Sequence, residues 1–314
     1  MRFSVIIPLY NKAPYVKKAI ESVIAQTFLD FELIVVDDGS DDDSFAVAKK
    51  VLKNSVVDYR LIHQENAGVS IARNNGVAAS HGDYICFLDA DDWWASSFLA
   101  RMDWLINEYP EAGIYGTNYY YVKNGSQKVC VRTADTGYIN YCQVYADGKA
   151  MPLTSISVAL KRHVFFELKG FKTSLKFGED FDLWIRIALR YKVAFLNEPL
   201  AYYNQDSNPK WRGIRNLPDP KLNMLWNLDY LEEEEKSNPA CKQLLDNLRT
   251  YGLFQYYLSK KYREAARQEL KKVDWGKQPQ STKNLYNTPV FILKCGRVLR
   301  KLGSIVKQGI IKHL

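Results

Sequence analysis

The sequence contains little cysteine, and its cysteines form no recognisable framework. The five cysteines are scattered through 314 residues, and none belongs to a CxxC motif or a Cys/His cluster. This spacing excludes a zinc site of closely spaced ligands and a small fold held by disulfides. We therefore expect a protein of a reducing cytoplasm.

Long apolar runs are also missing. The apolar start, residues 3–9, is too short for a signal peptide and continues into Tyr10-Asn11-Lys12 instead of a cleavage site. No segment reaches the roughly 20 apolar residues that are needed to cross a bilayer. The sequence predicts no membrane-spanning segment, which agrees with the expected cytoplasmic location.

Acidic residues are absent after Asp274. Residues 275–314 carry eight cations, which equals the net charge of +8 of the whole chain, so the main body is neutral. A neutral body argues against a nucleic-acid groove, and we expect no nucleic-acid partner. Residues 290–314 predict a basic amphipathic helix suited to peripheral contact with the membrane interface. Packing of its apolar face on the protein body, or on a second subunit in a homodimer, is the alternative.

What the first half of the chain does contain is an alternation of strand and helix patterns. This alternation predicts an α/β fold with a mostly parallel sheet flanked by helices. Ligands of such sheets bind beyond the carboxyl ends of the strands, where the acidic clusters 37–38 and 89–92 lie. The expected strands are 3–8, 32–36, 57–62 and 83–88, and the expected helices are 14–26, 43–53, 68–80 and 96–108.

The pattern changes in the second half. From 113 to 200 it is irregular around a helix at 180–191, and 210–220 has the composition of a linker. Helices are expected at 221–236, 239–258, 261–272 and 290–313. We expect two parts: an α/β domain over 1–215 and a helical C-terminal region over 216–314.

The turn Asp89-Ala90-Asp91-Asp92 crowds three carboxylates together. Their repulsion would be relieved by a divalent cation, and Mg²⁺ and Mn²⁺ prefer oxygen ligands combined with substrate phosphates. Asp-rich turns are also common as solvated turns. The position directly after a buried strand favours the metal interpretation.

Residues 37–40 also follow an expected strand. They allow either a turn with a helix cap or the recognition of a base or ribose by carboxylates. Arg73, early in an expected helix, would pair with Asp37 or Asp38, meet a donor substrate, or lie exposed on its helix. The sequence leaves these alternatives open.

Residues 178–180 place two carboxylates before an expected helix. A carboxylate there is favoured by the helix dipole, so N-capping is one explanation. The other is a general base, because a sugar hydroxyl must lose its proton as it attacks. Either Glu179 or Asp180 suits that role.

Five segments, in order and spacing, resemble the family-2 inverting glycosyltransferases of the GT-A fold, and the resemblance covers about 1–205. Because five ordered motifs match, the resemblance is more specific than any one motif. The segments are SVIIPLYN (4–11), ELIVVDDGSDD (32–42), NAGVSIARNNG (66–76), FLDADDWW (87–94) and GEDFDLWIRI (178–187).

The resemblance implies a nucleotide-diphosphate sugar donor, with UDP as the expected carrier and GDP or dTDP as alternatives, and Mn²⁺ or Mg²⁺ as cofactor. It places the catalytic base at Asp180. The nucleotide would be surrounded by Pro8, Tyr10 and Asp38 with Arg73 nearby, the DxD pair serving ribose, diphosphate and metal would be Asp89 and Asp91, and Asp92 would be a further metal ligand.

Processive members of this family carry a QxxRW motif and membrane-spanning helices. Here residues 210–212 are Lys-Trp-Arg without the glutamine spacing, so we expect a single-addition enzyme. A glycan or lipid-linked acceptor in cell-surface polysaccharide synthesis fits such an enzyme.

Two other functions remain as alternatives. A sugar-nucleotide nucleotidyltransferase would need a glycine-rich basic loop after the first strand, and residues 9–12 contain no glycine. A catalytically inactive nucleotide-binding scaffold would be expected to have lost acidic positions, yet all of them are filled.

Overall fold

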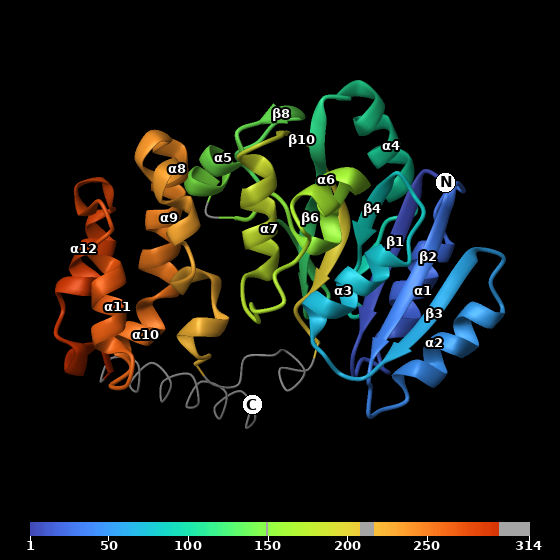
Figure 1. Cartoon of the computed structure of the whole chain (residues 1–314), viewed down its shortest axis with the longest axis horizontal. Coiled ribbons are helices and arrows are strands. Elements are labelled where there is room, and N and C mark those ends of the chain that lie inside the picture. The colour runs from blue at the N-terminus through green and yellow to red at the C-terminus, as the bar shows by residue number, and fades with distance from the viewer. Residues whose placement is uncertain (149, 208–216, 295–314) are drawn as a thin grey trace, which may run out of the picture. The chain divides into compact units, whose positions relative to one another are not determined.

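The computed structural model describes residues 1–148, 150–207 and 217–294 of the chain (Figure 1). Backbone contacts divide the chain into two compact units, Met1–Tyr230 and Leu231–Leu314. The domain boundary expected at 215/216 lies outside the described residues. In the described ranges no helix has both the length and the apolarity to cross a membrane. The four cysteines in these ranges are free thiols.

The first unit is built on one sheet whose first four strands are parallel. Every residue of β1 and β2 is buried, because helices cover both faces of this half of the sheet. The strands lie in the order β3-β2-β1-β4. Because they are parallel, the carboxyl ends of β1, β2 and β4 lie at the same end of the sheet. These strands are β1 (Phe3–Leu9), β2 (Phe31–Asp38), β3 (Asp58–Gln64) and β4 (Tyr84–Phe87).

Beyond β4 the sheet is mixed. β9 runs antiparallel to β4 and to β6, whereas β10 is parallel to β6. Two strands lie beside this path, with β7 next to β6 and β8 next to β10. The predicted α/β fold is confirmed, and the change of strand direction follows the end of the strand–helix alternation. The added strands are β5 (Trp93–Trp94), β6 (Ala112–Lys123), β7 (Ser126–Val129), β8 (Gly137–Ile139), β9 (Val158–Lys161) and β10 (Lys192–Asn204).

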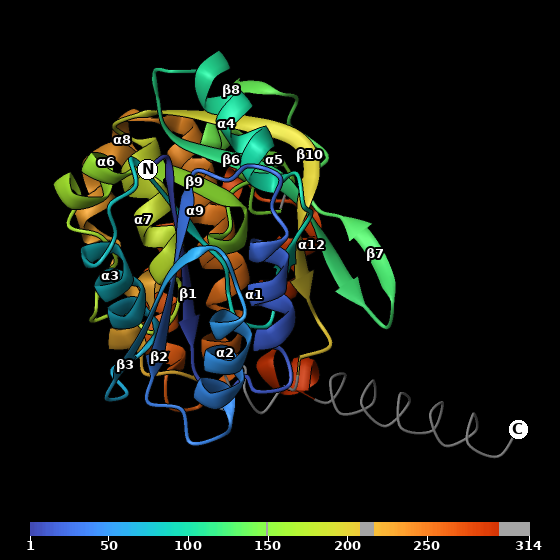
Figure 2. The same ribbon diagram turned by 90° about the vertical axis from the view of Figure 1, so that its right-hand side faces the viewer.

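Helices α1 and α2 cover one face of β1–β3, and α3 covers the other (Figure 2). The first four predicted helices and the predicted helix at 180–191 are present, with ends that differ by a few residues. α5 and α6 were not expected from the sequence, because each is only two turns long. The helices are α1 (Val16–Ile24), α2 (Ser44–Lys53), α3 (Val69–Ala78), α4 (Phe98–Glu108), α5 (Tyr141–Gly148), α6 (Arg162–Glu167) and α7 (Glu179–Ala188).

Helix α3 packs closely on β1 and β2 because residue 76 is glycine. A Cβ atom at Gly76 would lie 2.5 Å from Cγ2 of Ile6 and 3.3 Å from Cγ2 of Val36. The first of these distances is far below van der Waals contact, so a larger residue would push the helix away from the sheet. This close approach matters for function because α3 carries Arg73.

The helix predicted at 221–236 is wrong. The chain forms three short 3-10 turns, η3 (Pro220–Leu222), η4 (Met224–Trp226) and η5 (Asp229–Leu231), before α8 (Glu232–Ser237). The side chains of Asp219 and Asn223 accept hydrogen bonds from backbone N–H groups two residues further on. Such local bonds compete with the regular pattern of an α-helix.

The second unit is helical, as expected. The helix predicted at 239–258 is interrupted after Gly252, and α12 was not predicted. The expected basic helix at 290–314 falls mostly on residues 295–314, which lie outside the described residues. The helices after α8 are α9 (Pro239–Gly252), α10 (Phe254–Leu258), α11 (Arg263–Leu270), the 3-10 turn η6 (Trp275–Lys277) and α12 (Gln280–Asn287).

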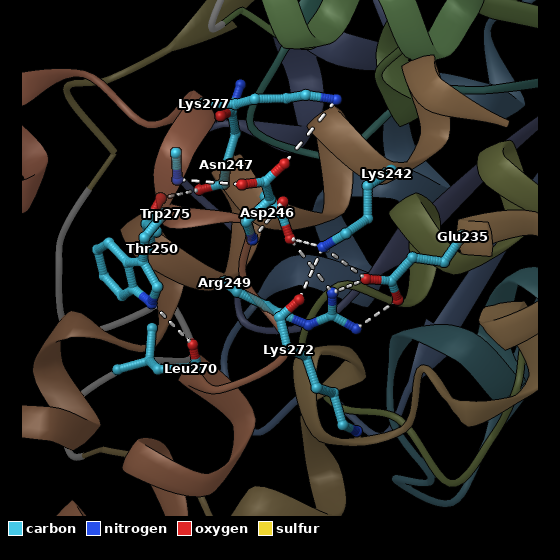
Figure 3. A network of polar contacts seen from close by, with 12 residues as sticks. Glu235, Lys242, Asp246, Asn247, Arg249, Thr250, Leu270, Lys272, Trp275 and Lys277 are labelled. Carbon is cyan, nitrogen blue, oxygen red and sulfur yellow. Dashed lines mark hydrogen bonds and ion pairs between the residues drawn. The ribbon is translucent and has the colours of Figure 1, made fainter.

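A charged network holds α8 to α9 in this unit (Figure 3). Arg249 of α9 is 1% exposed and binds both carboxylate oxygens of Glu235 with its two terminal nitrogens. Lys242 binds Asp246 and also the backbone carbonyl of Lys272. Paired charges explain how a buried arginine is tolerated in a small helical unit.

Candidate active site

The acidic turn after β4 is fixed at both ends. The backbone N–H of Asp92 bonds to the carbonyl of Asp89 at 3.0 Å, and Trp93 then pairs with β10. The carboxylate of Asp92 is 2% exposed and accepts the backbone N–H of Asn204 at 2.7 Å. Asp92 therefore ties the turn to β10, and its predicted role as a metal ligand stays a prediction.

The charges of the turn act on Asp92. Burial, together with the neighbouring charges of Asp91 and Asp89, holds the pKa of the Asp92 carboxyl well above its ordinary value. The hydrogen bond from Asn204 and the charge of Lys12 oppose this shift. A dication beside the turn would favour the ionised carboxylates in the same way as Lys12 does.

Asp91 is paired with a cation from another loop. The Nζ atom of Lys12, just after β1, lies 2.6 Å from Oδ2 of Asp91, and the two side chains are only 14% and 15% exposed. The Lys12 loop is in turn held because the side chain of Asn11 accepts the backbone N–H of Asp41. Lys12 was not expected at the site, because no residue pattern around it distinguishes it from a lysine exposed to solvent.

Arg73 joins the acidic turn to the start of α7. It is 3% exposed, and its two terminal nitrogens bind Asp89 at 2.7 Å and Glu179 at 3.0 Å. Burial alone would lower the pKa of Arg73, but the two carboxylates raise it, so the guanidinium stays charged. The expected alternatives of pairing with residues 37–38 or lying exposed are wrong, because α3 directs this side chain into the protein.

Asp180 lies in the first turn of α7, after Gly178 in a left-handed conformation with φ of 76°. Its Oδ1 accepts the N–H of Phe181 at 2.9 Å. Burial and the nearby charge of Glu179 raise the pKa of Asp180 to about 7, against the opposing effect of Arg73. Because Arg73 engages Glu179, Asp180 is the better placed of the two candidate bases.

The nucleotide-binding candidates lie at the ends of β1 and β2. Asp38 is 3% exposed, and its carboxylate accepts the side chain of Gln64 and the backbone N–H groups of Ala67 and Gly68, at 2.7–2.8 Å. It therefore already positions the beginning of α3. Its predicted contact with a base is not tested by these bonds.

Pro8 and Tyr10 complete this edge of the sheet. Pro8 is buried in β1 opposite Val36, and Tyr10 follows the strand with 42% of its surface exposed. Ion pairs thus connect Lys12 and Arg73 to the acidic turn 89–92, and Arg73 also to Glu179. Pro8, Tyr10 and Asp38 lie at the same sheet edge.

The described residues hold no group of three or more His, Cys, Asp or Glu side chains arranged to bind a metal ion. Carboxylate oxygens such as those of Asp91 are the ligand type that Mg²⁺ and Mn²⁺ prefer. A metal ion bound there would take the place of Lys12, whose Nζ atom lies 2.6 Å from Oδ2 of Asp91.

The sequence matches the profile of glycosyl transferase family 2 over residues 4–165. Glycosyltransferase GlyA of Streptococcus pneumoniae is 31% identical over 206 residues, which cover 65% of this chain and 27% of GlyA. Glycosyltransferase GlyG of the same organism is 26% identical over 252 residues, covering 76% of this chain and 80% of GlyG. The match spans about a third or less of the length of several curated relatives.

Solved structures share the fold. Residues 1–349 of Staphylococcus aureus TarS, in complex with UDP-GlcNAc, superpose with a TM-score of 0.73 at 19% identity, covering 91% of this chain and 84% of that one. A mannosyltransferase from Pyrobaculum calidifontis in complex with GDP-Man and Mn²⁺ gives a TM-score of 0.53 at 19% identity, with 88% of each chain covered. The GT-A fold expected from the sequence is thereby confirmed.

Proposed function

The chain belongs to glycosyl transferase family 2, and on this premise we propose that it is a metal-dependent inverting glycosyltransferase acting on a nucleotide-diphosphate sugar. The observation that carries the proposal is the double ion pair of Arg73. It places Asp89 of the acidic turn and Glu179, next to Asp180, on one guanidinium. A donor bound at the acidic turn would then lie beside a carboxyl able to accept a proton.

Asp180 is proposed as the general base. A carboxyl with a pKa of about 7 is half ionised near neutral pH and basic enough to accept the proton of an attacking hydroxyl. The hydroxyl attacks the anomeric carbon from the face opposite the diphosphate, and the configuration inverts. Arg73 keeps Glu179 engaged and limits its competition for the same proton.

The donor is proposed to be a UDP-sugar that transfers a hexosyl or N-acetylhexosaminyl group. Pro8, Tyr10 and Asp38 would contact the base, and Asp89 the ribose and diphosphate. A Mn²⁺ or Mg²⁺ ion held through Asp91, with Asp92 as a further ligand, would neutralise charge on the departing diphosphate. The complexes of TarS with UDP-GlcNAc and of the mannosyltransferase with GDP-Man and Mn²⁺ support this donor class.

A donor screen tests the proposal. The purified chain is incubated with Mn²⁺ and UDP-, GDP- or dTDP-sugars, with and without glycan acceptors, and the nucleotide products are measured. We expect release of free nucleoside diphosphate that depends on both acceptor and metal and is lost in Asp91→Ala. Formation of nucleoside triphosphate and sugar 1-phosphate from the donor when pyrophosphate is added would indicate a nucleotidyltransferase, and donor binding without any product would indicate a scaffold. Either result overturns the proposal.

The acceptor is proposed to be a glycan or lipid-linked hydroxyl compound of cell-surface polysaccharide synthesis. A cytoplasmic protein reaching such an acceptor would benefit from peripheral contact with the inner face of the membrane. The cations of residues 290–314 suit anionic headgroups, each contributing about 1 kcal/mol near the surface. Removal of 290–314 is expected to abolish binding to anionic vesicles at low salt, and vesicle binding that persists without it would refute this contact.

A further inference from the structure

A cavity lies at the end of the sheet opposite to the acidic turn, where β1 and β4 begin. Its volume is about 610 Å³, and it also borders the point where β9 meets α6. Asp83 and Tyr84 line it at the start of β4, whereas the acidic turn follows the other end of that strand. The cavity is therefore separate from the proposed donor site. The remaining lining residues are Arg2, His81, Gly82, Lys161, Arg162, His163 and Phe166.

The two arginines of this cavity each lie over an aromatic ring. The guanidinium of Arg2 lies 4.7 Å from the centre of the Tyr84 ring, and that of Arg162 lies 4.8 Å from the centre of the Phe166 ring. Phe166 is 47% exposed, so its ring contributes a wall of the cavity instead of core packing. Stacking restricts a guanidinium and leaves its planar set of donors available for an anion.

Part of the positive charge is not compensated. Arg2 is paired with Asp103 at 2.7 Å. In contrast, within the part of the chain that the structure describes, Lys161 donates only to the carbonyl of Pro110, and Arg162 has no carboxylate at ion-pair distance. The Nε atom of Arg162 is buried without a hydrogen-bond partner among the same residues.

The opposing charges are few. Asp83 is the single acidic residue among those lining the cavity in the described ranges. At the rim, His81 contacts Arg60 and lies 3.7 Å from Glu32. The carboxylate of Glu32 is therefore already in contact with Arg60 and His81. A body that is neutral overall thus concentrates unpaired cations in one hollow.

We propose that this cavity binds the phosphate group of a phosphorylated ligand, a phosphate monoester or diester, through Arg162 and Lys161. Arg recognises phosphate through two parallel N–H···O bonds, and Lys adds a point charge. The neighbouring carboxylate of Asp83 would favour a phosphate carried near a hydroxyl group, which can donate to it. The phosphorylated ligand would thus bind to the protein at a position that includes no residue of the proposed active site.

Calorimetric titration of the full chain with inorganic phosphate at constant ionic strength tests the proposal. We expect saturable binding that Arg162→Gln weakens by about tenfold, which corresponds to about 1.4 kcal/mol. Arg190→Gln, at an exposed arginine after α7, is the control and should bind phosphate as the unaltered chain does. Arg162→Lys retains the charge without the planar fork and should give an intermediate affinity, even if the glutamine variant folds poorly.

Two further probes distinguish the source of the phosphate. Glycerol 3-phosphate represents soluble esters, and vesicles containing phosphatidylglycerol represent lipid headgroups. If glycerol 3-phosphate competes with inorganic phosphate, and the unaltered chain and Arg162→Gln bind vesicles equally, the ligand is a soluble ester. Vesicle binding that falls in Arg162→Gln and is displaced by inorganic phosphate indicates a lipid. Absence of phosphate binding, equal binding by Arg162→Gln, or binding of free phosphate but of neither ester overturns the proposal.

Discussion

At the scale of single side chains, Arg73 organises the candidate active site. It is buried and charged, and it binds one carboxylate from each of two segments that lie 90 residues apart, Asp89 and Glu179. Its neighbour Asp180 is left with only the N–H of Phe181 as a hydrogen-bond donor in the described contacts. Arg73 thus forms an ion pair with Glu179 and acts on Asp180 through its charge alone, so the two adjacent acids have different surroundings.

Asp180→Asn tests the base directly. The substitution keeps the shape of the side chain and removes its proton-accepting carboxylate, so kcat should fall by roughly 10²–10⁴-fold. Donor affinity, measured by calorimetry, should stay nearly unchanged. The exposed Asp43→Asn serves as a control. Retention of most of the rate by the Asp180 variant would remove this residue from the proposed mechanism.

The raised pKa of Asp180 predicts a pH dependence with a definite sign. The base must be ionised to act, and its pKa is about 7, so kcat/KM should fall as the pH drops below about 7. The decrease should approach tenfold per pH unit, because one proton is involved. Steady-state rates measured over about pH 5.5 to 8.5 would reveal this dependence. A flat profile in this range would contradict the assignment.

At the scale of elements, α3 sets the position of Arg73 relative to the sheet. Asp38 fixes the start of the helix through the N–H of Gly68, and Gly76 allows its close contact with β1. β5 and β10 hold the acidic turn from the other side through Asp92 and Asn204. The site thus depends on elements that contribute no proposed catalytic group.

Gly76→Ala is expected to destabilise the first unit by about 1–3 kcal/mol, the usual effect of overpacking a tight contact. The added methyl group would displace α3 and with it Arg73, so donor binding should weaken as well. Chemical denaturation and donor titration measure the two effects. Asn75→Ala, on the exposed side of the same helix, should change stability little. Full stability in Gly76→Ala would show that the helix tolerates displacement.

At the scale of the whole molecule, each of the two compact units contains buried ion pairs. The first unit places them beside a large apolar core built on the sheet. The second, which is the smaller, contains the buried network around Arg249 (Figure 3). Since removal of one member leaves buried carboxylates without their partner, that network should be a sensitive point of the helical unit.

Arg249→Met should destabilise the second unit by about 3 kcal/mol, at the low end for a broken buried ion pair. The low end is expected because Lys242 still contacts Glu235 and Asp246. Hydrogen exchange of α9 peptides would report the loss as faster exchange. Arg267→Met removes a 53% exposed arginine and should leave exchange unchanged. Equal exchange in both variants would mean that the network contributes little.

From the sequence alone one could predict the strand–helix order of the first half, the placement of both acidic clusters at strand ends, and the helical character of the described residues after Tyr230. These features depend on periodicity and on local turn residues, which operate within one element. The sequence also indicated Asp180 as a candidate base, because a carboxylate at a helix start is a local pattern. Family membership was indicated by five ordered motifs and confirmed over residues 4–165.

Which charged side chains pair with one another depends on the tertiary fold. The partners of Arg73, the pairing of Lys12 with Asp91 and the burial of Asp92 join residues from distant segments. The two arginines of the cavity likewise come from distant segments, Arg2 just before β1 and Arg162 at the start of α6. Side-chain spacing along one element carries no information on such contacts, because they are fixed by the order and packing of strands and helices. The chemistry of each residue could therefore be predicted from the sequence, whereas its interaction partner could not.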